Sequence, residues 1–252
     1  MMNILHRGIR LAWMSCLVLL LWDSANAQPQ GERWFRLPNL PNGRDAGGVL
    51  GEKGYIPRGI LYRSNQPLYL TLDECAFFQQ RQVRTVVDFR YEAQRVAAPI
   101  APCLAAQVTY VPVGIWSDAD FAVGLTLQEL YLMAVNTYAA SFQTMFEILA
   151  EPRNLPVLIH CVAGKDRTGM AVALIYLLAG VPQEEVMAEY LRSNEVGFGV
   201  DSSWLQAVLD AVAREGGIEA FLAARGVSPA LQAAVQASLL ETPSHASVWA
   251  AY

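Results

Sequence analysis

Histidine is scarce in this chain, with three residues among 252, and only His160 and His245 lie beyond the first 27 positions. No group of cysteines and histidines has the spacing that metal ligands require. A Ser-His-Asp triad also needs a histidine, and few positions could supply one. The composition therefore argues against a metal-dependent hydrolase and against a serine hydrolase. We expect neither a metal nor a cofactor.

The chain also lacks an excess of positive charge. Its 18 lysine and arginine residues are outnumbered by 23 aspartate and glutamate residues, which gives a formal net charge of −5. Nucleic-acid partners need a basic surface, so this balance argues against one. Local positive potential must come from a few placed groups, and the candidates are Arg44, Arg63, Arg90, Lys165 and Arg167.

No apolar run in the sequence is long enough for a convincing membrane span, and the one near the N-terminus extends from Leu11 to Trp22. Arg7 and Arg10 precede this run, and Ala25-Asn26-Ala27 follows it as a small-x-small cleavage site. This order is typical of a secretion signal. We expect residues 1–27 to be removed, the protein to be exported to the periplasm or secreted, and no stable membrane anchor to remain after cleavage.

Cleavage would leave one domain over residues 28–241, and residues 242–252 are predicted to form a loose tail. Internal repeats and low-complexity linkers are absent from the sequence. The remaining cysteines are Cys75, Cys103 and Cys161. In an oxidising compartment this odd number permits one disulfide between Cys75 and Cys103 and leaves Cys161 free. Cys75 also fits a free thiol in an apolar core, and the sequence leaves both interpretations open.

What the chain does have is the stretch His160-Cys161-Val162-Ala163-Gly164-Lys165-Asp166-Arg167-Thr168-Gly169, which follows the apolar run 156–159. A loop of this kind turns backbone N–H groups toward one centre, and the helix that follows adds its positive end. Cys75 and Arg81 have the same Cys-x5-Arg spacing, but they lie in a predicted helix opened by the capping box Thr71 to Glu74. The loop therefore predicts a phosphate site, whereas the spacing alone does not.

The residue types of the loop indicate nucleophilic chemistry. Cysteines at helix N-termini beside cationic groups ionise readily, so Cys161 is predicted to be a thiolate nucleophile. Arg167 offers a planar fork of donors that matches two phosphoryl oxygens. Thr168 could donate its hydroxyl to the sulfur, and His160 could orient the loop from behind. The predicted substrate-binding residues are Val162, Ala163, Gly164, Lys165 and Thr168.

Cleavage of a phosphate ester also needs a proton for the leaving oxygen. Asp166, inside the loop, is the first candidate for this acid, although it could instead only orient Arg167. Asp88 is the second candidate, because it ends the run 85–88 at the carboxyl edge of a predicted strand. Asp118 and Asp120 are the third candidates for this acid, although their segment is also typical of a solvated turn.

Strands near 85–88, 108–113 and 156–160 alternate with helices that begin near Thr71, near Thr126 and after Thr168. Further helices are predicted from Pro182 as a first-turn proline, over 201–214, over 218–225 and over 228–241. This order predicts an α/β fold with a central, mostly parallel sheet flanked by helices and a helical C-terminal cap.

The loop and several further stretches resemble the atypical bacterial protein-tyrosine and phosphoinositide phosphatases. The similar stretches are residues 42–45, 58–64, 87–90, 189–194, 219–222 and 226–229. The resemblance implies a metal-free cysteine phosphatase fold that acts on phosphorylated proteins, at phosphotyrosine and also at phosphoserine or phosphothreonine, and on phosphoinositides. It also implies that Cys161 is the nucleophile, Arg167 the phosphate binder, Asp166 the loop aspartate, and Lys165 a residue linked to lipid head groups.

Three other functions remain open on the sequence. An inositol polyphosphate phosphatase would use the same loop on a different substrate. A catalytically inactive phospho-binding module would keep the loop and lose the chemistry. A thiol redox or sulfur-transfer enzyme also uses a loop cysteine, but it has less need of an arginine at the sixth position.

Overall fold

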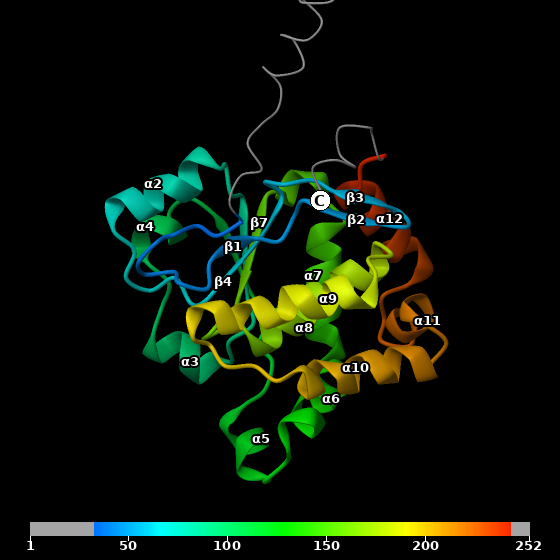
Figure 1. The fold of residues 1–252 in the computed structure, drawn as a ribbon. Helices are drawn as coiled ribbons and strands as arrows, with labels where there is room; N and C mark the ends of the chain where they lie inside the picture. Colours follow the sequence, from blue (N-terminus) through cyan, green and yellow to red (C-terminus); the bar gives the residue numbers. More distant parts are fainter. Residues whose placement is uncertain (1–32, 243–252) are drawn as a thin grey trace, which may run out of the picture. The chain divides into compact units, whose positions relative to one another are not determined.

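The computed structural model describes residues 33–242, so the predicted signal at 1–27 and nearly all of the predicted tail lie outside the described residues (Figure 1). A five-stranded sheet runs through the centre, in the order β1-β4-β7-β5-β6. Its strands are β1 (Arg44–Asp45), β4 (Leu61–Ser64), β7 (Val157–His160), β5 (Thr85–Asp88) and β6 (Thr109–Pro112). Only β1 is antiparallel to its neighbour.

The three inner strands β4, β7 and β5 are buried at every position, because helices cover both faces of the sheet. Their carboxyl ends therefore meet at one edge, where Ser64, His160 and Asp88 lie in register. A separate hairpin pairs β2 (Val49–Gly51) with β3 (Gly54–Ile56). The predicted α/β fold with a mostly parallel sheet is confirmed.

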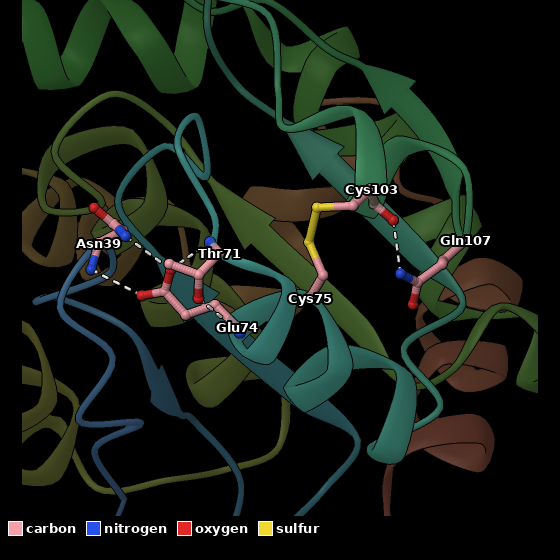
Figure 2. The surroundings of a disulfide bond; sticks show 6 residues. All are labelled: Asn39, Thr71, Glu74, Cys75, Cys103 and Gln107. Atoms are coloured by element: carbon pink, nitrogen blue, oxygen red, sulfur yellow. Dashed lines mark hydrogen bonds between the residues drawn. A yellow bond between two sulfur atoms is a disulfide. The ribbon is translucent and has the colours of Figure 1, made fainter.

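Helices α2 (Leu72–Gln80) and α4 (Pro102–Ala105) pack against one face of the sheet through a core that includes Phe78, Leu104 and Leu158. The predicted capping box is present, since Thr71 and Glu74 bond reciprocally at the start of α2. Glu74 also accepts two hydrogen bonds from Asn39 (Figure 2).

A disulfide joins Cys75 of α2 to Cys103 of α4 (Figure 2). Cys75 is buried, as expected for a core residue, but the interpretation of it as a free thiol is wrong. Among the described residues Cys161 is the free cysteine. The bridge therefore links the two helices of this face covalently and leaves the thiol of Cys161 free.

The other face carries the larger core and a second set of helices (Figure 1). These are α6 (Leu127–Thr137), α7 (Ala139–Leu149), α8 (Asp166–Leu178), α9 (Gln183–Leu191), α10 (Ser202–Arg214), α11 (Ile218–Ala223) and α12 (Pro229–Leu239). Helix α8 is buried almost throughout, because neighbouring helices surround it. The C-terminal helices α10 to α12 pack on α6, α7 and α8, as a helical cap would.

Short elements occupy the connections between these helices and strands. They are α3 (Glu92–Ala97), α5 (Asp118–Ala122), and the 3-10 turns η1 (Pro152–Asn154) and η2 (Arg192–Val196). The solvated turn predicted around Asp118 is wrong, because Asp118 begins α5. Pro182 is the N-cap of α9 and not a residue of its first turn. Helices α3 and α5 follow β5 and β6, so they stand beside the edge where the inner strands end.

Over residues 33–242, no helix has the length and apolar character needed to cross a membrane. Across the same residues, no group of three or more histidine, cysteine, aspartate and glutamate side chains is arranged to hold a metal ion.

Candidate active site

Cys161 directly follows β7, and a tight loop leads from it to Asp166, where α8 begins. The turn depends on Gly164, whose φ of +67° lies in the left-handed region. A Cβ atom there would stand 2.3 Å from the backbone oxygen of Ser64. Only glycine allows the loop to pack this closely against the end of β4.

Three consecutive carbonyls of the loop are held from outside. Val162 O accepts from the Gln66 amide at 2.9 Å, Ala163 O from Asn42 Nδ2 at 2.8 Å, and Gly164 O from Arg63 Nη2 at 2.6 Å. The C=O and the following N–H of a planar trans peptide point in opposite directions. The amides of Ala163, Gly164 and Lys165 therefore turn inward, and none donates to another group in residues 33–242. Together with the N-terminus of α8 they form a cradle for an anion.

A buried ion cluster stands behind these carbonyls. Glu189 Oε1 of α9 lies 2.9 Å from Arg44 Nε and 3.1 Å from Arg63 Nη1, and all three side chains are 0–5 % exposed. Burial by itself raises the pKa of Glu189, but Arg44 and Arg63 outweigh it and lower that pKa overall. Burial, followed by repulsion from Arg63, lowers the pKa of Arg44 to about 10. The cluster fixes Arg63, and through it the carbonyl of Gly164.

Arg167 reaches from α8 into the wall built by the segments that follow β5 and β6. Its Nη1 lies 2.9 Å from Gln94 Oε1, 3.2 Å from Phe89 O and 3.3 Å from Ile115 O. The guanidinium carbon lies 5.4 Å from the centre of the Trp116 ring, within range of a cation–π contact. Its Nε is buried without a partner among the described residues. One side of the fork is thus anchored, and a donor remains for an anion.

Asp166 is half-buried at the first position of α8. Its Oδ1 accepts a hydrogen bond of 2.8 Å from the Tyr131 hydroxyl of α6. That hydroxyl lies 2.8 Å from the hydroxyl of Tyr190 on α9. Tyr131 of α6 therefore holds the carboxylate that is the first candidate for the acid, and Tyr190 of α9 holds Tyr131.

Asp88 lies under the loop and not in it. It is fully buried, and its oxygens accept from Arg90 Nη2 at 2.7 Å and from the Tyr110 hydroxyl at 2.6 Å. Burial raises the pKa of Asp88, but His160, Arg90 and Tyr110 together lower it overall. Its partners are thus the buried groups beneath the loop.

His160 is also fully buried beside Asp88, with Nε2 3.5 Å from Asp88 Oδ2. Its Nδ1 lies 3.0 Å from the carbonyl oxygen of Cys161, which can only accept, so the hydrogen is on Nδ1. Burial lowers the pKa of His160. The ring thus ties the end of β7 to the start of the loop from behind.

The third-ranked acids lie on the exposed helix α5. Asp118 accepts a hydrogen bond from the Tyr91 hydroxyl, and Asp120 accepts from Ser117 Oγ at 2.8 Å and from the Tyr138 hydroxyl at 2.6 Å. Both carboxylates therefore have partners within their own segment and its neighbours.

Lys165 and Thr168 complete the predicted set. Lys165 Nζ donates to Gly199 O at 2.9 Å and lies 5.6 Å from the centre of the Trp204 ring, so it stands to one side of the loop. Thr168 is fully buried, and its hydroxyl has no partner among the described residues. A buried hydroxyl without a partner in the first turn of α8 fits a donor kept for the thiolate or its phosphoryl adduct.

The sequence did not single out Gln94, Tyr131 and Tyr190 as site residues. Tyr190 lies in a stretch that resembles the phosphatases, as do Asn42, Arg63 and Glu189, and these stretches meet behind the loop. Tyr131 gave no such signal, because a tyrosine at a buried position of an amphipathic helix also fits a simple core residue.

The site has a cysteine at the end of a buried strand, a cradle of loop amides, and an arginine at the start of a buried helix. Together these features define a cysteine-based phosphatase. Comparison with known proteins agrees, because residues 35–241 match the model of the tyrosine phosphatase family. The chain belongs to this family.

Individual relatives and one solved structure can be compared with the chain. A protein of Cupriavidus necator, provisionally named a tyrosine-protein phosphatase, is 29% identical over 185 residues, which is 68% of this chain and 67% of that protein. The triple specificity protein phosphatase PtpB of Mycobacterium tuberculosis is 55% identical over 40 residues, 16% of this chain and 14% of that protein. The structure of P. aeruginosa TpbA in complex with phosphotyrosine shares 23% identity and covers 76% of this chain and 98% of that one, with a TM-score of 0.38.

Proposed function

We propose that the protein hydrolyses phosphate monoesters through a phosphocysteine intermediate on Cys161, with phosphotyrosine in proteins as the first substrate class. The observation that carries this proposal is the loop whose three outward carbonyls leave three amides turned toward one centre beside Cys161. Such a cradle binds the phosphoryl group of the substrate and places its phosphorus against the sulfur.

In the first step the Cys161 thiolate attacks phosphorus, and the bond from phosphorus to the leaving oxygen breaks. Asp166 gives its proton to that oxygen, so the alcohol or phenol leaves neutral. Arg167 and the loop amides bind the equatorial oxygens, where charge is spread in the transition state. The partnerless Nε of Arg167 supports this role.

In the second step water attacks the phosphocysteine, and Asp166 takes a proton from this water. The bond from sulfur to phosphorus breaks, and inorganic phosphate leaves. Thr168 donates its hydroxyl to the departing thiolate, which stabilises the negative charge on sulfur. Asp88 has no contact with substrate in this scheme. Its place is to hold Arg90 beneath the loop, as their buried ion pair supports.

The substrate range extends to phosphoserine, phosphothreonine and phosphoinositides. The name of the M. tuberculosis relative, a triple specificity phosphatase, supports the wider range, because its 40 matched residues are 55% identical. The position of Lys165 beside the loop, over Trp204, supports a contact with further charged groups of a substrate.

We also propose that the protein works outside the cytoplasm, in the periplasm or the medium, and without a stable membrane anchor. The signal pattern at residues 1–27 supports export. The disulfide between Cys75 and Cys103 supports it independently, because such bonds persist in oxidising compartments and are rare in the cytosol.

The test is phosphate release from a phosphotyrosine peptide, a phosphoserine peptide, phosphatidylinositol phosphates and phytate. Wild type and Cys161→Ser are assayed side by side with EDTA and a reductant. We expect activity in wild type alone, with the phosphotyrosine peptide turned over faster than phytate.

The other outcomes separate the competing functions. Faster release from phytate would establish the inositol polyphosphate alternative. Phosphotyrosine binding without turnover would identify a binding module, and activity retained in Cys161→Ser would overturn the mechanism.

A further inference from the structure

The two carboxyl oxygens of Asp166 have different surroundings. Oδ1 accepts the hydroxyl of Tyr131 at 2.8 Å, whereas Oδ2 has no hydrogen-bond partner in residues 33–242. A carboxyl group that delivers a proton must do so from one oxygen, and it is most effective when that oxygen already faces the leaving group. Occupation of Oδ1 by a fixed donor leaves Oδ2 for this task.

Tyr131 is fixed by its own packing. Its side chain is 0 % exposed on α6, and its ring lies 6.2 Å from the ring of Trp116 and 6.4 Å from that of Trp204. Burial, with a contribution from the charge of Asp166, raises the pKa of Tyr131 well above that of a free phenol. The hydroxyl therefore keeps its hydrogen and is a donor.

Tyr190 holds the hydroxyl of Tyr131 from α9, at 2.8 Å, and its side chain is 1 % exposed. The Tyr190 ring packs against Gly169 of α8, where a Cβ atom would stand 2.8 Å from ring carbon Cδ2. The pair of tyrosines thus joins α6 and α9 to the first turn of α8. A glycine at position 169 is what lets the ring come this close.

We propose that Tyr131, oriented by Tyr190, is a positioning residue that fixes which carboxyl oxygen of Asp166 faces the leaving group. The inference rests on the proposed function, because it takes Asp166 as the acid and base of the two steps. In the first step the proton passes from Oδ2 to the leaving oxygen as the phosphorus–oxygen bond breaks, and Tyr131 stabilises the carboxylate that results. In the second step the same Oδ2 takes a proton from the attacking water.

The experiment is a double-mutant cycle of Tyr131→Phe and Asp166→Asn, with kcat and KM measured on phenyl phosphate. A second comparison uses p-nitrophenyl phosphate, whose leaving group needs little protonation. The matched control is Tyr176→Phe. It removes an equally buried hydroxyl, which donates to Ala46 O at 2.6 Å and does not contact Asp166.

We expect Tyr131→Phe to lower kcat on phenyl phosphate about tenfold, as for loss of a hydrogen bond to a charged group, with little change in KM. The loss should be smaller on p-nitrophenyl phosphate and should vanish in the Asp166→Asn background. Tyr190→Phe should show the same pattern with a smaller loss. Tyr176→Phe should leave kcat unchanged on both substrates.

Two results would overturn the inference and leave the proposed function standing. One is an equal loss of kcat from Tyr131→Phe in the wild-type and Asp166→Asn backgrounds. The other is an equal loss of kcat on phenyl phosphate and on p-nitrophenyl phosphate. Both would mean that the tyrosine only stabilises the fold. A different result would overturn the acid assignment in the proposed function. In that case Asp166→Asn itself would lower kcat by the same factor on both substrates.

Discussion

Gly164 is the residue on which the shape of the loop depends, for two separable reasons. Its φ of +67° disfavours any side chain, and a Cβ atom would also collide with Ser64 O at 2.3 Å. Gly197 has a similar φ of +80°, but no atom lies within 4 Å of its hypothetical Cβ. A substitution at Gly197 therefore introduces backbone strain alone, whereas one at Gly164 introduces the same strain together with a steric clash.

We predict that Gly197→Ala costs only about 1–2 kcal/mol of unfolding free energy, the strain of a left-handed alanine. Gly164→Ala should cost more, because the loop must move away from β4, and it should lower kcat/KM for p-nitrophenyl phosphate by at least about a hundredfold. Urea unfolding and steady-state kinetics on both variants check this. Equal effects of the two substitutions would show that the contact with Ser64 is unimportant.

At the residue scale the sequence predicts the strand, loop and helix around Cys161, because these residues are contiguous and their pattern is local. Asp88 shows where this reasoning ends. Its place at the carboxyl end of a strand is correct, but only the folded chain shows that Arg90 and Tyr110 surround it. Tyr131 shows the same limit. Its burial is visible in the helical pattern, but its contact with Asp166, 35 positions away, is not.

At the scale of elements, α9 supports the loop from behind. Glu189 forms ion pairs with both Arg44 and Arg63, whereas Glu184 on the same helix is exposed. Removal of one partner from a buried ion cluster leaves charges without compensation.

We predict that Glu189→Gln lowers the unfolding free energy at pH 7 by about 3–5 kcal/mol and that Glu184→Gln changes it by less than about 1 kcal/mol. The effect should depend on pH. The pKa of Glu189 is lowered below its ordinary value of 4.5, so its contribution is complete above that pH and is lost as pH falls through the lower pKa of the folded protein.

Urea unfolding between pH 7 and pH 3 measures this prediction. The difference in unfolding free energy between wild type and Glu189→Gln should shrink below about pH 4.5. A difference that stays constant down to pH 3 would mean that packing, and not charge, causes the loss.

The sequence predicts elements that have a long or strongly marked pattern. Strand 85–88 is confirmed at its stated bounds, and the helices opened by Thr71 and Thr126 begin where their capping boxes place them. Strands β1 to β4 were missed, since β1, β2 and β3 have only two or three residues and β4 owes its pairing to β1 and to the distant β7.

For the whole molecule, the disulfide shows what a count of cysteines leaves open. An odd number permits the bridge, but a buried free thiol at Cys75 fits the same sequence. The fold decides between them by bringing α2 and α4 side by side, with the two Cα atoms 6.1 Å apart. The predicted signal and tail stay predictions, because they lie outside residues 33–242.

We predict that the double variant Cys75→Ala/Cys103→Ala loses about 3–4 kcal/mol of unfolding free energy, because the bridge closes a loop of 28 residues. Its kcat and KM should match those of wild type, since the bridge joins α2 to α4 and the nucleophile stays free. Urea unfolding with and without dithiothreitol checks both points. The reductant should destabilise wild type alone, and a fall in activity in the double variant would instead tie the bridge to the site.

Arg44 and Glu189, which stand together behind the loop, are 145 positions apart in the sequence. During synthesis the ribosome releases Cys161 and Arg167 before the carboxylate that compensates Arg44 and Arg63 has emerged. Until then the nascent chain has a nucleophile but no rigid anion cradle. A product truncated before α9 would therefore carry the signature residues of the loop without the carboxylate that holds Arg44 and Arg63 in place.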